Sequence, residues 1–117
     1  MDRQPIVTAA APAAIGPYSQ GISAGELVFV SGQTPLKADG TMISGSVAEQ
    51  TEQCLKNIQE VLRAAGLGMD RVVKTTVYMT DLGRFAEMNE VYARGFAAPF
   101  PARATVQVSA LPKGAAV

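Results

Sequence analysis

The chain has 117 residues, a length typical of one domain, so we expect a single domain over residues 1–117. Apolar residues make up 48% of the chain and charged residues 17%, with ten basic and ten acidic side chains and a net charge of zero. This balance is typical of a globular protein. It gives no electrostatic support for binding to nucleic acid.

The chain has no histidine, which excludes Ser-His and Cys-His nucleophiles and His-containing metal sites. It also has no phosphate-binding GxxxxGK[ST] or GxGxxG motif, so we expect neither a metal nor a cofactor. The single cysteine cannot form an internal disulfide, which favours a reducing, cytoplasmic compartment. We expect no signal peptide and no membrane partner, because no apolar stretch approaches the roughly 18 residues of a membrane span.

Residues 6–8 are expected to form a short edge strand. Residues 18–23 and 26–31 are strand-like runs around Ala24-Gly25, which predicts a hairpin. The second run, ELVFVS, is apolar at alternate positions on both sides, so we expect a central strand that is buried on both faces. Residues 32–45 then form a glycine-containing loop.

A helix is predicted from Ser46, which forms a capping box with Glu49, to Gly66, which ends it. Its apolar positions recur at helical spacing: Val47, Cys54, Leu55, Ile58, Val61, Leu62 and Ala65. Cys54 lies on this stripe, and we interpret it as a core residue rather than a nucleophile.

Residues 71–80 are rich in β-branched and aromatic types, which predicts a strand. A second helix begins after Asp81 or Gly83 and ends before Pro99 and Pro101. Its apolar stripe is Phe85, Met88, Val91, Tyr92 and Phe96. Residues 102–108 are the next predicted strand.

This order predicts an α+β fold with a mixed β-sheet and two helices packed on one face. Two helices can cover only one face of the sheet. Because ELVFVS is apolar on both faces, we expect self-association to cover the other.

Arg103 is an unusual residue for a short strand that is partly buried. Alternation groups it with Thr105 and Gln107, opposite Ala102, Ala104, Val106 and Val108. We expect the apolar set to face the helices and Arg103 to lie on the helix-free face. It is then either a surface or interface arginine, or a clamp whose guanidinium fork binds a carboxylate.

Three other positions are candidates, each with a structural alternative. Tyr18 in GPYSQG is either a core residue or a phenol at the lip of a pocket. Ser31 and Gly32 either form a turn at the end of a strand or offer hydrogen-bond donors to a ligand. Asn89 either faces solvent or, lying between Phe85 and Tyr92 on the stripe, is a hydrogen-bonded orienting residue.

Four motifs occur together: AAIGPYSQG, FVSGQTP, VVKTTVYMTDL with MNEVY following, and FPARATVQVSALPK. In this order they resemble the RidA (YjgF-type) family of reactive intermediate deaminases. The similarity runs from about Ala11 to the end of the chain, and FPAR with its downstream S-x-L-P is the most specific part.

The resemblance implies a chorismate-mutase-like fold and a homotrimer with clefts between subunits. It implies hydrolysis of 2-imino acids, such as 2-iminopropanoate and 2-iminobutanoate, to 2-keto acids and ammonia. By the same resemblance Arg103 holds the substrate carboxylate, Tyr18 and Ser31 are catalytic, and Asn89, Gly32 and Thr105 bind substrate. Relatives often have cysteine at the position of Thr105.

Relatives also continue with a glutamate-containing strand after the LPK turn, and we expect this C-terminal strand to be truncated at Val117. One alternative function is a non-catalytic trimeric binder of small carboxylates. Another is a nuclease or translation inhibitor, as reported for some relatives. The zero net charge and the lack of histidine argue against this second alternative.

Overall fold

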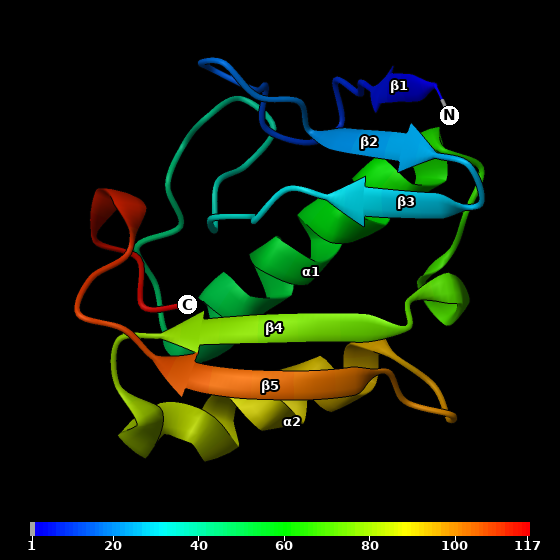
Figure 1. Cartoon of the computed structure of the whole chain (residues 1–117). Coiled ribbons are helices and arrows are strands. Elements are labelled where there is room, and N and C mark those ends of the chain that lie inside the picture. Colours follow the sequence, from blue (N-terminus) through cyan, green and yellow to red (C-terminus); the bar gives the residue numbers. More distant parts are fainter. Residues whose placement is uncertain (1) are drawn as a thin grey trace.

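The computed structural model describes residues 2–117 and has an α+β architecture (Figure 1). In chain order its elements are β1 (Arg3–Ile6), β2 (Gly21–Ala24), β3 (Leu27–Val30), α1 (Val47–Ala64), β4 (Lys74–Met79), α2 (Phe85–Gly95) and β5 (Ala102–Gln107). Short 3₁₀ turns lie at Met69–Arg71, Leu82–Arg84 and Pro112–Gly114. Both predicted helices and the four later strands form, but the prediction of a strand at residues 6–8 is wrong, because the first strand is Arg3–Ile6.

The strands form two hydrogen-bonded sheets instead of the single mixed sheet that we predicted. β1, β2 and β3 pair antiparallel in that order, and β4 and β5 pair in parallel. β3 is therefore an edge strand of its sheet, and the prediction that residues 26–31 form a central strand is wrong. The apolar pattern of a strand reports which faces it can bury, but it does not report which backbone edges meet.

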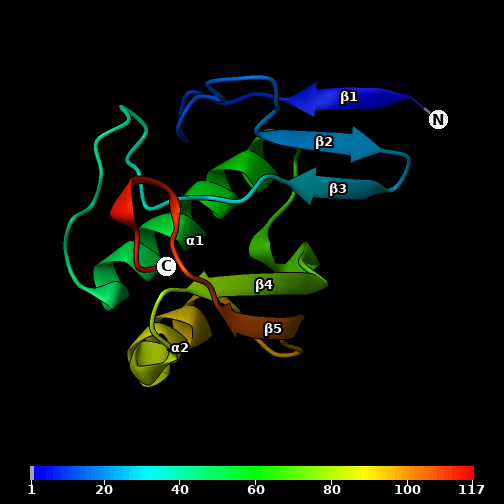
Figure 2. The same cartoon turned by 60° about the vertical axis from the view of Figure 1, so that its left-hand side comes forward.

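Both helices cover one face of the strands and leave the other face bare, as predicted (Figures 1 and 2). α2 packs behind β4 and β5, and α1 runs behind the gap between the two sheets. The core under the helices has two clusters: Met79, Met88, Tyr92 and Phe96 in one, and Ile6, Ala11 and Val61 in the other.

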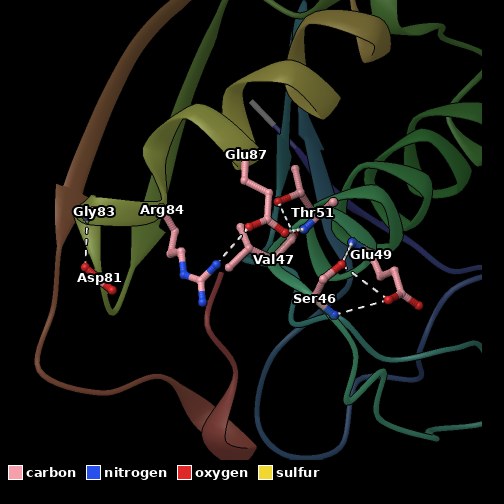
Figure 3. A network of polar contacts seen from close by, with 9 residues as sticks. Ser46, Val47, Glu49, Thr51, Asp81, Gly83, Arg84 and Glu87 are labelled. Carbon is pink, nitrogen blue, oxygen red and sulfur yellow. Dashed lines mark hydrogen bonds and ion pairs between the residues drawn. The ribbon is translucent and has the colours of Figure 1, made fainter.

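The ends of α1 are formed as the sequence predicts. Ser46 Oγ accepts a hydrogen bond from the Glu49 N–H at 3.2 Å, and Glu49 Oε1 accepts one from the Ser46 N–H at 3.2 Å (Figure 3). Glu87 of α2 adds a second cap, because its Oε2 accepts from the Ala48 N–H at 3.0 Å. This bond joins the start of α1 to the neighbouring helix.

At its other end α1 closes with a Schellman motif. Gly66 adopts φ +78°, a left-handed value that glycine tolerates best. The Gly66 N–H donates to the Arg63 carbonyl and the Leu67 N–H to the Leu62 carbonyl, both at 2.9 Å. The predicted role of Gly66 is confirmed.

Polar side chains are also buried along α1, which its apolar stripe did not predict. Asn57 is 1% exposed, and its Nδ2 donates to the carbonyls of Thr34 and Leu36. Gln50 is 5% exposed; its Nε2 donates to the Ile43 carbonyl. These amides attach the loop after β3 to the helix, since buried backbone carbonyls need hydrogen-bond donors.

The bare face of the sheets is apolar and open to solvent. Val28 and Val30 pack toward the core, whereas Leu27 and Phe29 are 60% and 59% exposed. The prediction that ELVFVS is buried on both faces is therefore wrong for this chain by itself. Tyr78 of β4 and Val106 of β5 are 49% and 40% exposed.

The orientation that we predicted for β5 is reversed. The register pairs Arg103 with Thr75 and Gln107 with Met79, and Met79 is fully buried in the core beneath the helices. Directly paired residues share a face, so Arg103, Thr105 and Gln107 face α2, and Ala102, Ala104 and Val106 face outward. Alternation separates two sets of residues correctly, but it cannot tell which set faces the helices when the bare face is also apolar.

Candidate functional site

Arg103 is the centre of the candidate site and is held by side chains of α2. Its Nη1 donates to Asn89 Oδ1 at 2.7 Å. Its guanidinium carbon lies 4.7 Å from the centre of the Tyr92 ring and 5.3 Å from that of Phe85, both cation–π distances. Asn89 is half-buried and hydrogen-bonded, and its partner is Arg103.

Arg103 has no carboxylate partner among residues 2–117. The ion pairs in this part of the chain are Arg63–Glu60, Arg84–Glu87 and Arg94–Glu90. An amide oxygen and two aromatic faces leave the guanidinium with its full positive charge. One of its five N–H donors is used by Asn89, so the others can bind an anion.

A cavity of about 390 Å³ lies beside this guanidinium. It is lined by Asn89, Tyr92, Ala93, Phe100, Pro101 and Arg103. The volume is within the range of small-molecule sites, which typically hold about 300–1,000 Å³. One cation beside walls that are partly polar and partly apolar suits a small organic acid.

Thr105 lies two residues beyond Arg103 on the same face of β5. Its Oγ1 is buried and has no hydrogen-bond partner within residues 2–117. A buried hydroxyl without a partner is uncommon in folded proteins.

The other predicted site residues lie elsewhere in the chain. Tyr18 is 55% exposed in the loop before β2, and Ser31 follows β3 and donates through Oγ to the Ser19 carbonyl at 2.5 Å. Gly32 is exposed, and a Cβ there would meet no atom within 4 Å. None of the three lines the Arg103 cavity, because β3 and β5 belong to different sheets with β4 between them (Figure 1).

A second cavity, of about 350 Å³, lies at the start of α1, and its charged side chains already have partners. Arg84 pairs with Glu87 at 3.4 Å, and Asp81 accepts from the Gly83 N–H at 2.8 Å (Figure 3). Over residues 2–117 no group of three or more His, Cys, Asp or Glu side chains is arranged to hold a metal ion. No helix in the same range is long and apolar enough to cross a membrane.

Comparison with known proteins identifies the family. The sequence profile described as Endoribonuclease L-PSP, which represents the RidA (YjgF) family, matches residues 8–117. The chain belongs to the RidA family.

Individual RidA-family relatives match along most of their length. The chain is 56% identical over 115 residues to the RutC family protein y4sK of Sinorhizobium fredii, covering 97% of this chain and 91% of that protein. It is 47% identical over 116 residues to the human protein named 2-iminobutanoate/2-iminopropanoate deaminase, covering 98% and 85%. The crystal structure of E. coli TdcF with bound serine has a TM-score of 0.92 at 42% identity, covering 97% of this chain and 91% of that one.

The sequence alone did not place three side chains at this candidate site. Phe85 and Tyr92 were assigned only to the apolar stripe of the second helix, and Phe100 was used only as part of the FPAR motif. A signal was present, because Phe85, Asn89 and Tyr92 are four and three residues apart and so share one helix face. An amide flanked by two aromatic rings on one face is suited to hold a guanidinium.

Proposed function

We propose that this protein hydrolyses reactive 2-imino acids, such as 2-iminopropanoate and 2-iminobutanoate, to 2-keto acids and ammonia. The observation that carries the proposal is Arg103, a guanidinium without a carboxylate partner among residues 2–117 that faces a small cavity. Two relatives named 2-iminobutanoate/2-iminopropanoate deaminase, which are 47% and 46% identical to this chain, support the same reaction class.

In the proposed reaction the substrate carboxylate binds to Arg103 in a bidentate manner. Water adds to the carbon of the C=N bond and forms a carbinolamine. The C–N bond then breaks, nitrogen leaves as ammonia with protons supplied by the water, and the carbon keeps the oxygen as a ketone. The imine carbon is already electrophilic, so holding the carboxylate and one water in place accounts for much of the acceleration.

The remaining site residues reach this cavity only if another chain supplies them. We therefore propose a homotrimer in which Tyr18, Ser31 and Gly32 of one subunit face Arg103 of a neighbour. The exposed apolar face of the sheets, including Phe29 and Tyr78, supports such an assembly. In the cleft, Tyr18 and Ser31 would orient substrate and water, and the Gly32 N–H would offer a backbone donor.

Thr105 and Asn89 have different roles in this proposal. Thr105 would contact substrate through its backbone, because its Oγ1 is buried and its side chain does not line the cavity. Asn89 would act on the substrate through Arg103, because its Oδ1 is already occupied by the guanidinium.

The test of the proposal is replacement of Arg103. The imine is generated in the assay by an amino-acid oxidase or a threonine dehydratase, and formation of keto acid and ammonia is followed. Arg103→Ala is expected to lower kcat/KM about 100-fold, the upper end of the effect of one charge-assisted contact. Arg103→Lys, which keeps the charge but not the fork, is expected to lie between Arg103→Ala and the wild type.

Arg94→Ala is the matched control, because Arg94 lies on α2, the helix that holds Arg103, but is exposed and paired with Glu90 at 3.6 Å. Full activity in Arg103→Ala would refute the assignment. A non-catalytic binder is the second candidate, favoured by the TdcF structure that contains serine. Calorimetric binding of 2-ketobutanoate without accelerated ammonia release would support the binder instead.

A further inference from the structure

We infer that the hydrogen bond between Thr75 and Tyr92 positions Arg103, and that these two are positioning residues for the anion site. The hydroxyls of Thr75 and Tyr92 lie 2.7 Å apart. The inference deepens the proposed function, because it rests on Arg103 as the carboxylate-binding group. It concerns how an exposed arginine is kept in one orientation before ligand arrives.

A flexible arginine side chain has to be ordered before it can clamp a ligand. The loss of its rotamer freedom weakens binding if this freedom is lost only when the ligand arrives. Arg103 is exposed and has no carboxylate partner among residues 2–117. Its order therefore depends on the ring beneath it and on the amide beside it.

The Tyr92 ring is buried and carries a hydrogen bond at its hydroxyl. It is 5% exposed, and it packs against Phe96 at a centroid distance of 4.7 Å within the core cluster that includes Met79 and Met88. The bond to Thr75 then fixes the outer end of the ring, which packing alone leaves free to tilt.

Thr75 is the residue of β4 that pairs directly with Arg103 of β5. The anchor of the ring and the arginine that stacks on it are therefore attached to neighbouring positions of one parallel ladder. The ladder fixes the spacing of the Thr75 and Arg103 backbones. Tyr92 of α2 contacts both side chains, through its hydroxyl to Thr75 and through its ring face to Arg103. Asn89, one turn earlier on α2, accepts a hydrogen bond from Arg103 Nη1. We call Thr75, Tyr92 and Asn89 together the frame of Arg103.

The frame predicts an effect that is transmitted only through Arg103. Tyr92→Phe keeps the ring and removes the hydroxyl, whereas Thr75→Val keeps the shape of the threonine and removes the other partner. Both variants should let the ring tilt and the guanidinium rotate. We expect KM to rise about fivefold with kcat nearly unchanged, a size typical of one cation–π contact.

The experiment measures Arg103 without any ligand and then measures catalysis. In arginine-labelled protein, NMR signals of the Arg103 side chain report rotation about the Nε–Cζ bond. The wild type is expected to show separate Nη signals from hindered rotation, assigned by their loss in Arg103→Lys. Tyr92→Phe and Thr75→Val should each merge these signals, while thermal unfolding confirms that both variants are folded.

Thr51→Val is the matched control, because Thr51 is 3% exposed and donates to the Val47 carbonyl on α1, outside the cavity. It should leave both the Arg103 signals and KM unchanged. In an Arg103→Lys background, Tyr92→Phe should have no further effect on KM, since coupled residues give non-additive changes. If Tyr92 had only a structural role, the effects of Tyr92→Phe and Arg103→Lys on KM would be additive in this double-mutant cycle.

The outcomes separate this inference from the proposed function. Unchanged Arg103 signals in both variants would overturn the inference, and so would merged signals with wild-type KM. Merged signals in a protein that hydrolyses no imine would support the frame and refute the proposed reaction. In that case the cycle is repeated on calorimetric binding of 2-ketobutanoate, and additive losses of affinity would overturn the positioning role.

Discussion

Arg103 and its neighbours show how a charge can be held in a strand without being neutralised. Its contacts are the Asn89 amide oxygen at 2.7 Å and the faces of Tyr92 and Phe85. A carboxylate in their place would bind the same N–H groups that a substrate needs, and a ligand would have to displace it. Neutral acceptors order the guanidinium and leave its charge for the ligand.

Cys54, unlike the exposed Arg103, is buried and stays uncharged. It is buried on α1, and its Sγ donates to the Gln33 carbonyl at 3.2 Å. Burial raises the pKa of the Cys54 thiol from 9.0 to about 12. The thiol therefore stays protonated near neutral pH, which supports the interpretation as a core residue instead of a nucleophile.

This pKa predicts how stability depends on alkaline pH. As the pH rises above about 9, the unfolded chain releases the thiol proton while the folded chain retains it until about pH 12. The unfolded state then binds fewer protons, so the free energy of unfolding falls by up to about 1.4 kcal/mol per pH unit. Urea unfolding between pH 8 and 11 should show this fall in the wild type, and Cys54→Ala should lack that component. An equal pH dependence in the variant would contradict the prediction.

At the scale of the elements, α1 carries the signals that make it predictable from sequence. Its capping box, its apolar stripe and its terminal glycine agree with one another, and the helix forms over Val47–Ala64. Its buried amides, Gln50 and Asn57, are the part that the stripe did not indicate. They are buried because the loop after β3 brings its carbonyls onto the helix, a contact that local sequence does not encode.

Ser46→Ala is expected to lower the free energy of unfolding by about 1 kcal/mol, because it leaves the Glu49 N–H without its capping acceptor. The change can be measured by urea denaturation. Ser44→Ala is the control, since Ser44 is exposed and precedes the cap. Equal stability of the Ser46→Ala variant and the wild type would show that the Glu87 cap at Ala48 is sufficient.

At the scale of the whole molecule, the chain has a covered face and a bare one. Leu27, Phe29, Tyr78 and Val106 on the bare face are each at least 40% exposed. Tyr18, Ser31 and Gly32 are also separated from the Arg103 cavity within one chain. The proposed homotrimer would account for both features, by burying the apolar face and by placing Tyr18, Ser31 and Gly32 of one subunit at the Arg103 cavity of a neighbour.

Phe29→Glu is expected to convert the proposed trimer into folded monomers and to abolish deaminase activity, because a buried unpaired carboxylate is costly. Light scattering coupled to size-exclusion chromatography measures the assembly. Gln59→Glu adds the same charge on the exposed side of α1 and should leave the trimer and its activity intact. A wild type that is monomeric and fully active would refute the assembly.

The sequence alone determined the helices, the strands and the α+β class, because caps, turn residues and apolar periodicity act within a few residues. It also indicated Arg103 and Asn89, whose residue types suit carboxylate binding and orientation. It could not determine the two-sheet pairing, the edge position of β3 or the face of β5 that carries Arg103. The pairing depends on which strand edges meet. The face of β5 that carries Arg103 depends on the side chains of α2 that contact it, such as Asn89 and Tyr92. Only the tertiary structure connects Thr75 of β4, Tyr92 and Asn89 of α2 and Arg103 of β5, since the hydrogen bonds from Thr75 to Tyr92 and from Arg103 to Asn89 join separate elements.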